Sequence, residues 1–488
     1  MSTFVPLVPA VSPAVPKRRS DVELARAAPA LTPVKQTIRT VWFSLLLGSI
    51  CLEGLGRRYL PAIPSAAFYF LKDGILIAGL LRFRINRDVK TVMSSLYGRY
   101  AAFLKVAILW TFVEIFNPQQ QSIVLGFIGL RAYWLWWVAP LIVASVLLDP
   151  AVRRKVVFLQ AGITVIVAVL AILQFGAPVN DPLNTYSVVD GEESLAFAVE
   201  STGRARVSST FSFISGFADF AILVPVLLLS IGLGEKDSKA RLAALIGVLF
   251  AAAALPMSGS RGPFVTSLGL CTMVVWRAGL IFTPVGRRVI LIAILAAFTS
   301  VYAFPDALQG VMDRFGNSDT EERSGEFFTV LPPVALIKYE GYPFFGTGTG
   351  MMQNYRQLFG SPSEDAVEGE VARYLWELGA GGYLLVWIAK FGLVMALWKS
   401  SKLLKKAGRS AAAASALAYA FLAFYGNLAF DHVYTALFFV GFGFILQEVV
   451  QVRIDARLAR HQNSLPAPEK ATLPLLAEPA ALAGEPGA

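Results

Sequence analysis

The chain has 488 residues, of which 56% are hydrophobic and 16% are charged, and its mean hydropathy is +0.59. This composition excludes an ordinary water-soluble domain of such length and indicates a protein that resides in a bilayer. The net charge of +10 does not point to nucleic acid, because the basic residues form short clusters between apolar stretches. Cys51 and Cys271 lie in apolar stretches without metal-ligand spacing, so neither a zinc site nor a disulfide framework is predicted.

The apolar stretches extend from about residue 40 to 450 and predict one transmembrane domain, residues 39–452, between two tails. Residues 1–38 are rich in Pro, Ala and Val and show no apolar core before a small-residue cleavage site, which argues against a cleaved signal peptide. Residues 453–488 become dense in Pro, Ala and Glu toward the end. We expect both tails to be cytoplasmic and largely disordered.

A helix needs about 20 apolar residues to cross the hydrocarbon core. By this criterion we predict an all-α, polytopic fold with about twelve transmembrane helices. Residues 123–130 are interpreted as a re-entrant or broken helix. The predicted spans lie near residues 40–55, 62–81, 100–116, 132–148, 155–175, 210–233, 241–257, 263–282, 288–304, 371–397, 411–429 and 433–450.

The short connections between these spans carry Lys/Arg clusters, for example Arg153 to Lys155 and Lys399 to Arg409. With twelve spans all of these clusters fall on one side, which the positive-inside bias identifies as the cytoplasm, together with both termini. Two long loops, residues 176–209 and 304–370, then face the periplasm. Loops of this length in a compact membrane protein tend to be functional.

The sequence Ser258-Gly-Ser-Arg-Gly262 forms the outward connection between two predicted spans. The guanidinium of Arg261 at such a tight turn, beside the Ser260 hydroxyl and backbone N–H groups, suits a phosphate oxygen. The alternative is a turn whose arginine only reaches lipid headgroups. Sequence physics leaves both interpretations open.

The first outer loop ends in Gly203-Arg-Ala-Arg-Val-Ser-Ser-Thr-Phe-Ser212 and leads into a predicted helix that contains Asp219. Arg204, Arg206 and several hydroxyls thus crowd a helix N-terminus, where the dipole favours anions. A simple Ser/Thr helix cap with arginines facing lipid phosphates is the alternative.

The second outer loop contains Arg323 among acidic residues, and later the glycine string Gly346-Thr-Gly-Thr-Gly350. The mixed charges fit a solvated amphipathic helix best. The string around Gly348 follows no clear strand, so it does not imply a nucleotide fold.

At the end of this loop, Glu368 and Glu370 precede the span at 371–397. On a helix, Glu370, Arg373 and Glu377 share one face. A carboxylate there, steadied by an arginine, suits a general base toward a sugar hydroxyl. An acidic helix N-terminus that merely seats the helix is the alternative.

Several ionisable residues fall inside apolar stretches and are candidate functional residues because intramembrane charge is costly. Arg131 follows Gly129-Leu130 near the predicted outer surface and is grouped with Arg206 and Arg261. The others are Lys72, Asp73, Lys105, Glu114, Asp219, Asp431 and His432.

Taken in order, these motifs resemble the O-antigen ligase and polymerase superfamily, the Wzy-like integral membrane glycosyltransferases. The resemblance covers roughly residues 40–450. It rests on residues 129–133, 206–213, 258–262 and 346–350 and on Glu377-x-Gly379-x-x-Gly382.

The resemblance implies a GT-C-like fold and a metal-independent, inverting transfer of a glycan from an undecaprenyl-diphosphate carrier at the periplasmic face of the bacterial inner membrane. No cofactor is implied. Arg206, Arg261 and Arg131 would bind the diphosphate, with Arg204, Ser260, Arg323, Arg373 and Gly348 as further substrate contacts.

Many ligases of this superfamily carry His-Asn where this chain has Glu368-Gly369. The absence of a loop histidine favours a polymerase of exopolysaccharide or O-antigen repeat units, with Glu370 or Glu368 as base. A ligase that transfers glycan to lipid A core or protein, and a flippase of lipid-linked sugar, are the alternatives. Expected partners are the lipid-linked glycan, membrane lipids and a chain-length-regulating protein, but not nucleic acid.

Overall fold

The computed structural model describes residues 32–60, 63–185, 202–279, 304–307, 331–338, 343–352 and 369–464, with a few single residues between 287 and 341. Every regular element of five or more residues in this part of the chain is a helix, which confirms the all-α prediction. Leu31–Gln451 forms one compact unit, and the described site residues lie in it.

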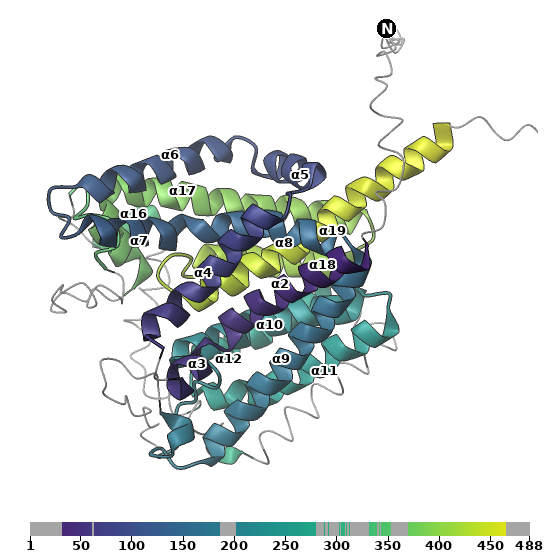
Figure 1. Cartoon of the computed structure of the whole chain (residues 1–488), viewed down its shortest axis with the longest axis horizontal. Helices are drawn as coiled ribbons and strands as arrows, with labels where there is room; N and C mark the ends of the chain where they lie inside the picture. Colours follow the sequence, from purple (N-terminus) through teal and green to yellow (C-terminus); the bar gives the residue numbers. More distant parts are fainter. Residues whose placement is uncertain are drawn as a thin grey trace, which may run out of the picture. The chain divides into compact units, whose positions relative to one another are not determined.

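The helices of five or more residues are α2 (Pro33–Cys51), α3 (Glu53–Tyr59), α4 (Ser65–Arg82), α5 (Arg87–Tyr97), α6 (Tyr100–Val113), α7 (Ile123–Trp134), α8 (Ala139–Leu147), α9 (Pro150–Gly176), α10 (Ile214–Gly234), α11 (Ser238–Ala254), α12 (Arg261–Arg277), α16 (Pro332–Lys338), α17 (Glu370–Lys406), α18 (Ser410–Tyr425) and α19 (His432–Ser464). Figure 1 labels them along the chain.

Six of the described helical segments are long and apolar enough to cross a membrane, and a seventh results if the bent pair α2 and α3 forms one span. The chain is therefore a polytopic membrane protein. The six segments are Ile123–Leu147, Pro150–Gly176, Ile214–Gly234, Ser238–Ser258, Glu370–Lys406 and His432–His461.

Helices also occupy five of the other six predicted spans, but they depart from a simple crossing. The pair α2 and α3 is bent by 65°, and α4 carries Lys72, Asp73 and Arg82. The helices α6, α12 and α18 have 14, 17 and 16 residues, which is short for a full crossing. Apart from residue 304, the predicted span at 288–304 lies outside the continuously described residues.

Three further boundaries differ from the sequence-based predictions. Residues 123–130, interpreted as a re-entrant or broken helix, belong to a single 25-residue segment, Ile123–Leu147. The helix α2 begins at Pro33, inside the predicted N-terminal tail, because a proline at the first helical position needs no N–H partner. The helix α19 continues to Ser464, beyond the predicted end of the membrane domain.

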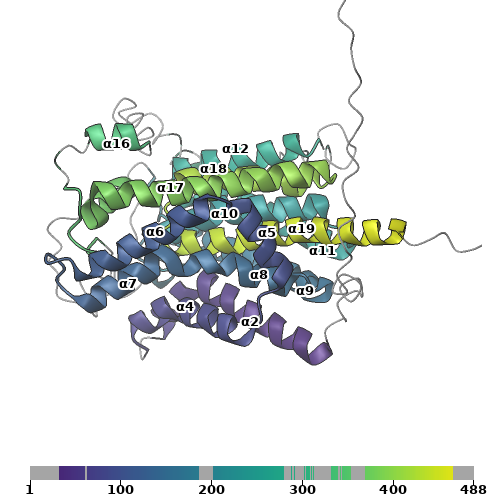
Figure 2. The ribbon, with the colours of Figure 1, turned by 90° about the horizontal axis from the view of Figure 1, so that it is seen from above.

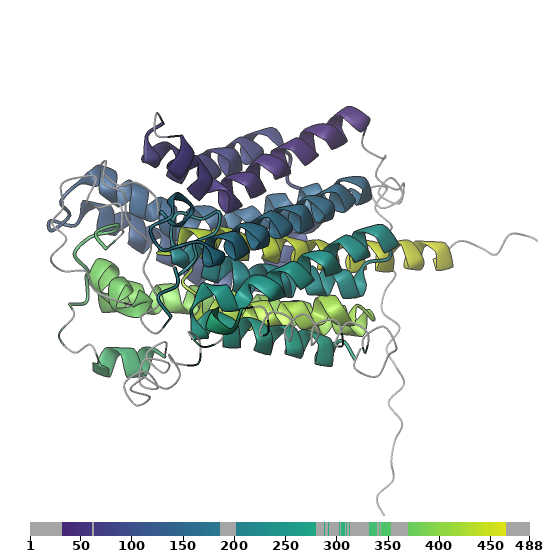
Figure 3. The same cartoon turned by 90° about the horizontal axis from the view of Figure 1, so that it is seen from below.

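The core of this unit is built around α19, whose apolar segment is the most buried of the candidate spans. Phe444 of α19 makes an edge-to-face contact with Phe43 of α2, and Phe438 stacks obliquely on Tyr419 of α18. Gly443 lies against Val143 of α8. Figures 2 and 3 show α19 between the layer of α2 and α4 and the layer of α12, α17 and α18.

At one end of the bundle, ion pairs link several of the connections that carry Lys/Arg clusters. Arg153 at the start of α9 pairs with Glu235 after α10 and with Glu448 of α19. Glu448 also pairs with Arg409, just before α18. The connections that begin or end α9, α10 and α18 therefore meet at this end, which we call the basic end.

Candidate functional site

The end of the segment predicted as the first outer loop meets the turn before α12. The Nη2 atom of Arg206 donates a hydrogen bond to Oγ of Ser260 at 2.9 Å. Ser260 is the N-cap residue of α12, whose first residue is Arg261. Two segments that the sequence predicts to bind phosphate thus lie beside each other, at a helix N-terminus where backbone N–H groups also favour an anion.

The turn that follows Arg206 is tightly held. Ser209 is fully buried and has a left-handed backbone, φ 52°, a conformation that a non-glycine residue keeps only under strong local constraint. Its N–H donates to Oε1 of Gln174 at 2.6 Å and its hydroxyl to the Val167 carbonyl at 2.6 Å. The carbonyl oxygen of Ser209 accepts from Nη1 of Arg58 at 2.9 Å.

Arg58 of α3 thereby holds residues 203–212, which we call the arginine loop. Its guanidinium also donates to the Ser208 hydroxyl and to the carbonyl of Phe211. The neighbouring residue Arg57 places its guanidinium carbon 5.7 Å from the ring centre of Tyr69 on α4. Basic side chains from α3 therefore adjoin the segment that contains Arg206.

Tyr69 is the centre of a second group of cations. Lys72 Nζ lies 5.1 Å and Arg131 Cζ 5.0 Å from the centre of its ring. Its hydroxyl accepts a hydrogen bond from Nη2 of Arg131 at 3.3 Å and is hydrogen-bonded to Nε2 of His432. Cation–π attraction and this hydroxyl gather α4, α7 and the start of α19 around one side chain.

Two of these cations have carboxylate partners. Lys72 pairs with Glu53, and Nη1 of Arg131 lies 2.6 Å from Oδ2 of Asp73, whose other oxygen accepts from Nε1 of Trp136 at 2.9 Å. Lys72 and Asp73 thus have partners on different elements, because adjacent residues of a helix do not share a face. With Arg57 and Arg58 the group carries an excess of positive charge, which suits an anionic ligand.

The glycine string lies against a break in α17. At Gly379 the backbone has φ 67° and ψ −178°, a region open to glycine almost alone. Residues 343–348 pack against this break. The Ala380 N–H donates a hydrogen bond to the Pro343 carbonyl at 3.0 Å, and the Gly348 N–H donates to the Glu377 carbonyl at 3.2 Å. A Cβ on Gly346 would lie 2.0 Å from the carbonyl oxygen of Glu377, so this approach requires glycine.

Glu377 holds the far end of the glycine string. Its carboxylate is fully buried and accepts from the N–H groups of Gly350 at 2.9 Å and Met352 at 2.6 Å. It also accepts from the hydroxyl of Tyr133 at 2.8 Å. Because Tyr133 lies two residues after Arg131 on α7, Glu377 ties the string to the helix that carries this arginine.

Glu370, the predicted base, is the first residue of α17. Its carboxylate accepts from the Tyr374 hydroxyl at 2.6 Å and from the N–H of Leu428 at 3.2 Å. Lys390 Nζ lies 3.1 Å from its Oε2 atom and also donates to the Gly426 carbonyl at 3.0 Å. Glu370 therefore joins the N-terminal end of α17 to the connection between α18 and α19.

The remaining predicted site residues are dispersed. Arg204 pairs with Asp306 at 3.0 Å, and Arg373 lies over the ring of Phe430 at 5.5 Å. Gly348 has φ 115°, and its N–H donates to the Glu377 carbonyl, which holds the glycine string against α17. Glu368 and Arg323 lie outside the described residues.

Sequence reasoning missed four residues of this arrangement, namely Arg57, Arg58, Tyr69 and Lys390. The only signal for the first two was a basic pair that follows Gly54 and Gly56. Tyr69 and Lys390 stand in apolar runs, where nothing local predicts their partners. Among the described residues no group of three or more metal-ligating side chains is close enough to hold a metal ion.

Comparison with known proteins yields no match to this chain among protein-family models, curated proteins or solved structures.

Proposed function

We propose that the protein is a polymerase that joins undecaprenyl-diphosphate-linked oligosaccharide repeat units of an exopolysaccharide or O-antigen. In this reaction an acceptor hydroxyl oxygen forms a bond to the anomeric carbon of the donor sugar. The bond from that carbon to the diphosphate breaks, a base takes the hydroxyl proton, and undecaprenyl diphosphate leaves. The proposal needs neither metal nor cofactor.

The contact between Arg206 and Ser260 is the observation that carries this proposal. It brings Arg206 beside the turn that begins with Arg261, and Arg58 adjoins the same loop through Ser209. Guanidinium groups at a helix N-terminus suit the two phosphates of the donor and stabilise the negative charge that develops as the leaving group departs.

Arg131 is assigned to the same ligand as a secondary contact. It lies with Lys72 and Arg57 around Tyr69, and Arg57 and Arg58 are consecutive residues that connect this group to the arginine loop. Such clustering of cations is typical of a site that binds and holds an anion. It fits less well with a transport pathway, which would carry charges at many depths. Glu370 and Glu368 are the two candidates for the general base that takes the proton of the acceptor hydroxyl.

The finer fold belongs to the same proposal. We infer twelve spans in a GT-C-like arrangement in the bacterial inner membrane, with both termini in the cytoplasm and the arginines at the periplasmic face. The six or seven candidate spans of the described part and the convergence of basic connections at one end support a polytopic arrangement of this orientation.

The test is to incubate purified protein with a defined undecaprenyl-diphosphate repeat unit and to follow product length on a gel. The proposal expects a ladder of longer lipid-linked glycans. Donor that is bound but converted neither to polymer nor to free undecaprenyl diphosphate contradicts it. Transfer only when a lipid A core acceptor is added would identify the ligase alternative.

A further inference from the structure

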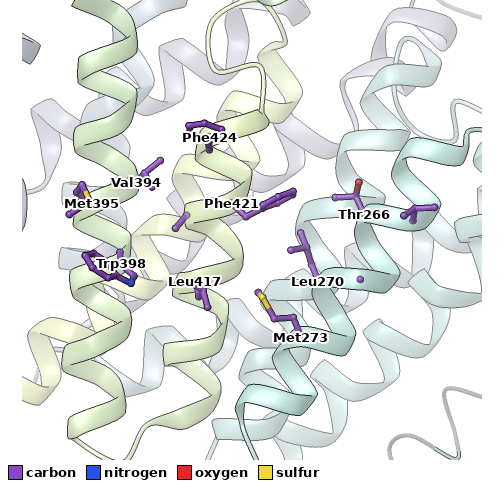
Figure 4. A pocket seen from close by; sticks show the side chains of 12 residues that line it. Thr266, Leu270, Met273, Val394, Met395, Trp398, Leu417, Phe421 and Phe424 are labelled. Carbon is purple, nitrogen blue, oxygen red and sulfur yellow. The ribbon is translucent and has the colours of Figure 1, made fainter. Parts of the chain in front are cut away.

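A groove of about 880 Å³ lies between α12 and α17, with α18 as its floor. Figure 4 shows Leu270 and Met273 on one side, Met395 and Trp398 on the other, and Phe421 from the floor. Apart from Thr266, every residue that lines it is apolar or glycine. The volume is that of a small-molecule site, and the lining selects a hydrocarbon chain.

The lining side chains are accessible from outside the bundle. Val265 is 53% exposed, Phe421 42% and Trp398 41%. These residues belong to the apolar helices α12, α17 and α18 of a membrane protein, so we expect this face to meet the acyl region of the bilayer. A chain that enters the groove therefore needs no passage through water.

Two basic side chains stand one helical turn beyond the end of the groove. Arg277 follows Met273 by four residues on α12, and Lys402 follows Trp398 by four residues on α17, so each shares a face with a lining residue. The ammonium of Lys402 lies 3.5 Å from the centre of the Trp398 ring. Arg277 and Lys402 are both exposed.

The two cations belong to the basic end of the helices. The helix α17 ends in Lys405 and Lys406, and Arg409, which follows it, pairs with Glu448. At the other end of α12, Arg261 is only partly exposed and lies beside the Arg206 contact. Exposed positive charge next to the groove is thus found at the basic end, where a lipid phosphate of the same leaflet would lie.

We propose that this groove binds one acyl chain of an anionic phospholipid of the cytoplasmic leaflet, with its phosphate between Arg277 and Lys402. Trp398 then stands at the interface between chain and headgroup, the depth that tryptophan prefers in membranes. This site is separate from the proposed donor site and does not depend on the proposed function.

Gly269 offers a direct way to fill the groove. It lines the groove, and a Cβ built on it meets no heavy atom within 4 Å. The Cβ of Gly269→Leu is therefore accommodated, and the rest of the leucine side chain should take up space in the groove. Gly162 of α9 has equally open surroundings but does not line the groove, so Gly162→Leu is the matched control.

The experiment measures lipid retained by the purified full-length protein in native mass spectrometry. Phosphatidylglycerol and phosphatidylcholine with identical acyl chains are the two probes. We expect one phosphatidylglycerol to be retained in preference to phosphatidylcholine, Gly269→Leu to abolish its retention, and Gly162→Leu to leave it unchanged.

The double variant Arg277→Gln with Lys402→Gln should lower the affinity for phosphatidylglycerol on the order of fivefold for each charge removed. Lys239→Gln with Arg241→Gln on α11 removes two other exposed charges and should have no such effect. Equal retention of both lipids by the unaltered protein overturns the headgroup assignment. Unchanged lipid retention in Gly269→Leu would refute the groove as the acyl-chain site. In that case the lipid binds elsewhere, or another segment of the chain fills this space.

Discussion

Lys390 and Glu370 form an ion pair of 3.1 Å although twenty residues of the same helix α17 separate them. In an unbroken α-helix that separation corresponds to about 30 Å. The break at Gly379 must therefore turn residues 370–378 back along the rest of the helix. This fold-back brings Glu370 to the connection between α18 and α19 and presents Glu377 to the glycine string.

The ion pair predicts a strong asymmetry between single and double substitutions. Lys390→Met leaves the largely buried Glu370 carboxylate without its cation and should destabilise the protein by about 3–5 kcal/mol. Lys390→Met combined with Glu370→Gln removes both charges and should restore much of the loss. Thermal unfolding in detergent measures both. A single variant as stable as the unaltered protein would show that the pair does not hold the fold-back.

Gly379→Ala tests the break itself. The backbone at this residue is nearly exclusive to glycine, at a cost of about 1–3 kcal/mol for other residues, and a Cβ would lie 2.3 Å from the carbonyl oxygen of Phe344. We expect a lower unfolding temperature. Gly162→Ala, within α9 and with open surroundings, should be neutral or slightly stabilising. Equal behaviour of the two variants would argue against the docked glycine string.

Glu377 is expected to control the order of the glycine string. Glu377→Ala leaves the N–H groups of Gly350 and Met352 without their charged acceptor, and such bonds contribute about 1.5–3 kcal/mol each. Hydrogen exchange in residues 343–352 should accelerate at least about tenfold. Tyr133→Phe removes a donor to the same carboxylate and should have a smaller effect. Unaltered exchange in Glu377→Ala would mean that other contacts hold the string.

The arginine pair predicts a loss of catalysis without a loss of protein. Arg206→Ala and Arg261→Ala should each reduce the rate of glycan transfer on the order of 10²–10³-fold, the range observed when a donor to developing negative charge is removed. Arg241→Ala, an exposed residue of α11, is the control for charge and expression. Full activity in both variants would refute the diphosphate clamp.

Hydropathy predicted the helices well because apolar run length is a local property. It does not reveal where a helix departs from a simple apolar crossing, as α4 does at Lys72 and Asp73 and as α18 does with only 16 residues. The sequence predicts the segments of Arg206 and Ser260 at the same face of the membrane. The hydrogen bond between Arg206 and Ser260 depends on the packing of the helices and could not be predicted from the sequence.

The fold-back of α17 could not be predicted. Glu370, Arg373 and Glu377 fit one helix face in the sequence, and nothing local shows that Gly379 adopts a non-helical backbone or that Lys390 is a partner. Likewise Tyr69 is an ordinary residue of an apolar run until α7 and α19 bring Arg131 and His432 to it. Long-range pairing of this kind depends on how the helices pack.

The central claim is that the arginine site supports bond formation and not only donor binding. The most direct measurement is the release of undecaprenyl diphosphate in proteoliposomes supplied with the lipid-linked repeat unit. The account predicts one undecaprenyl diphosphate released for each glycosidic bond formed, and neither product with Arg206→Ala combined with Arg261→Ala. Movement of intact donor across the bilayer with no release of undecaprenyl diphosphate would contradict it and identify a flippase.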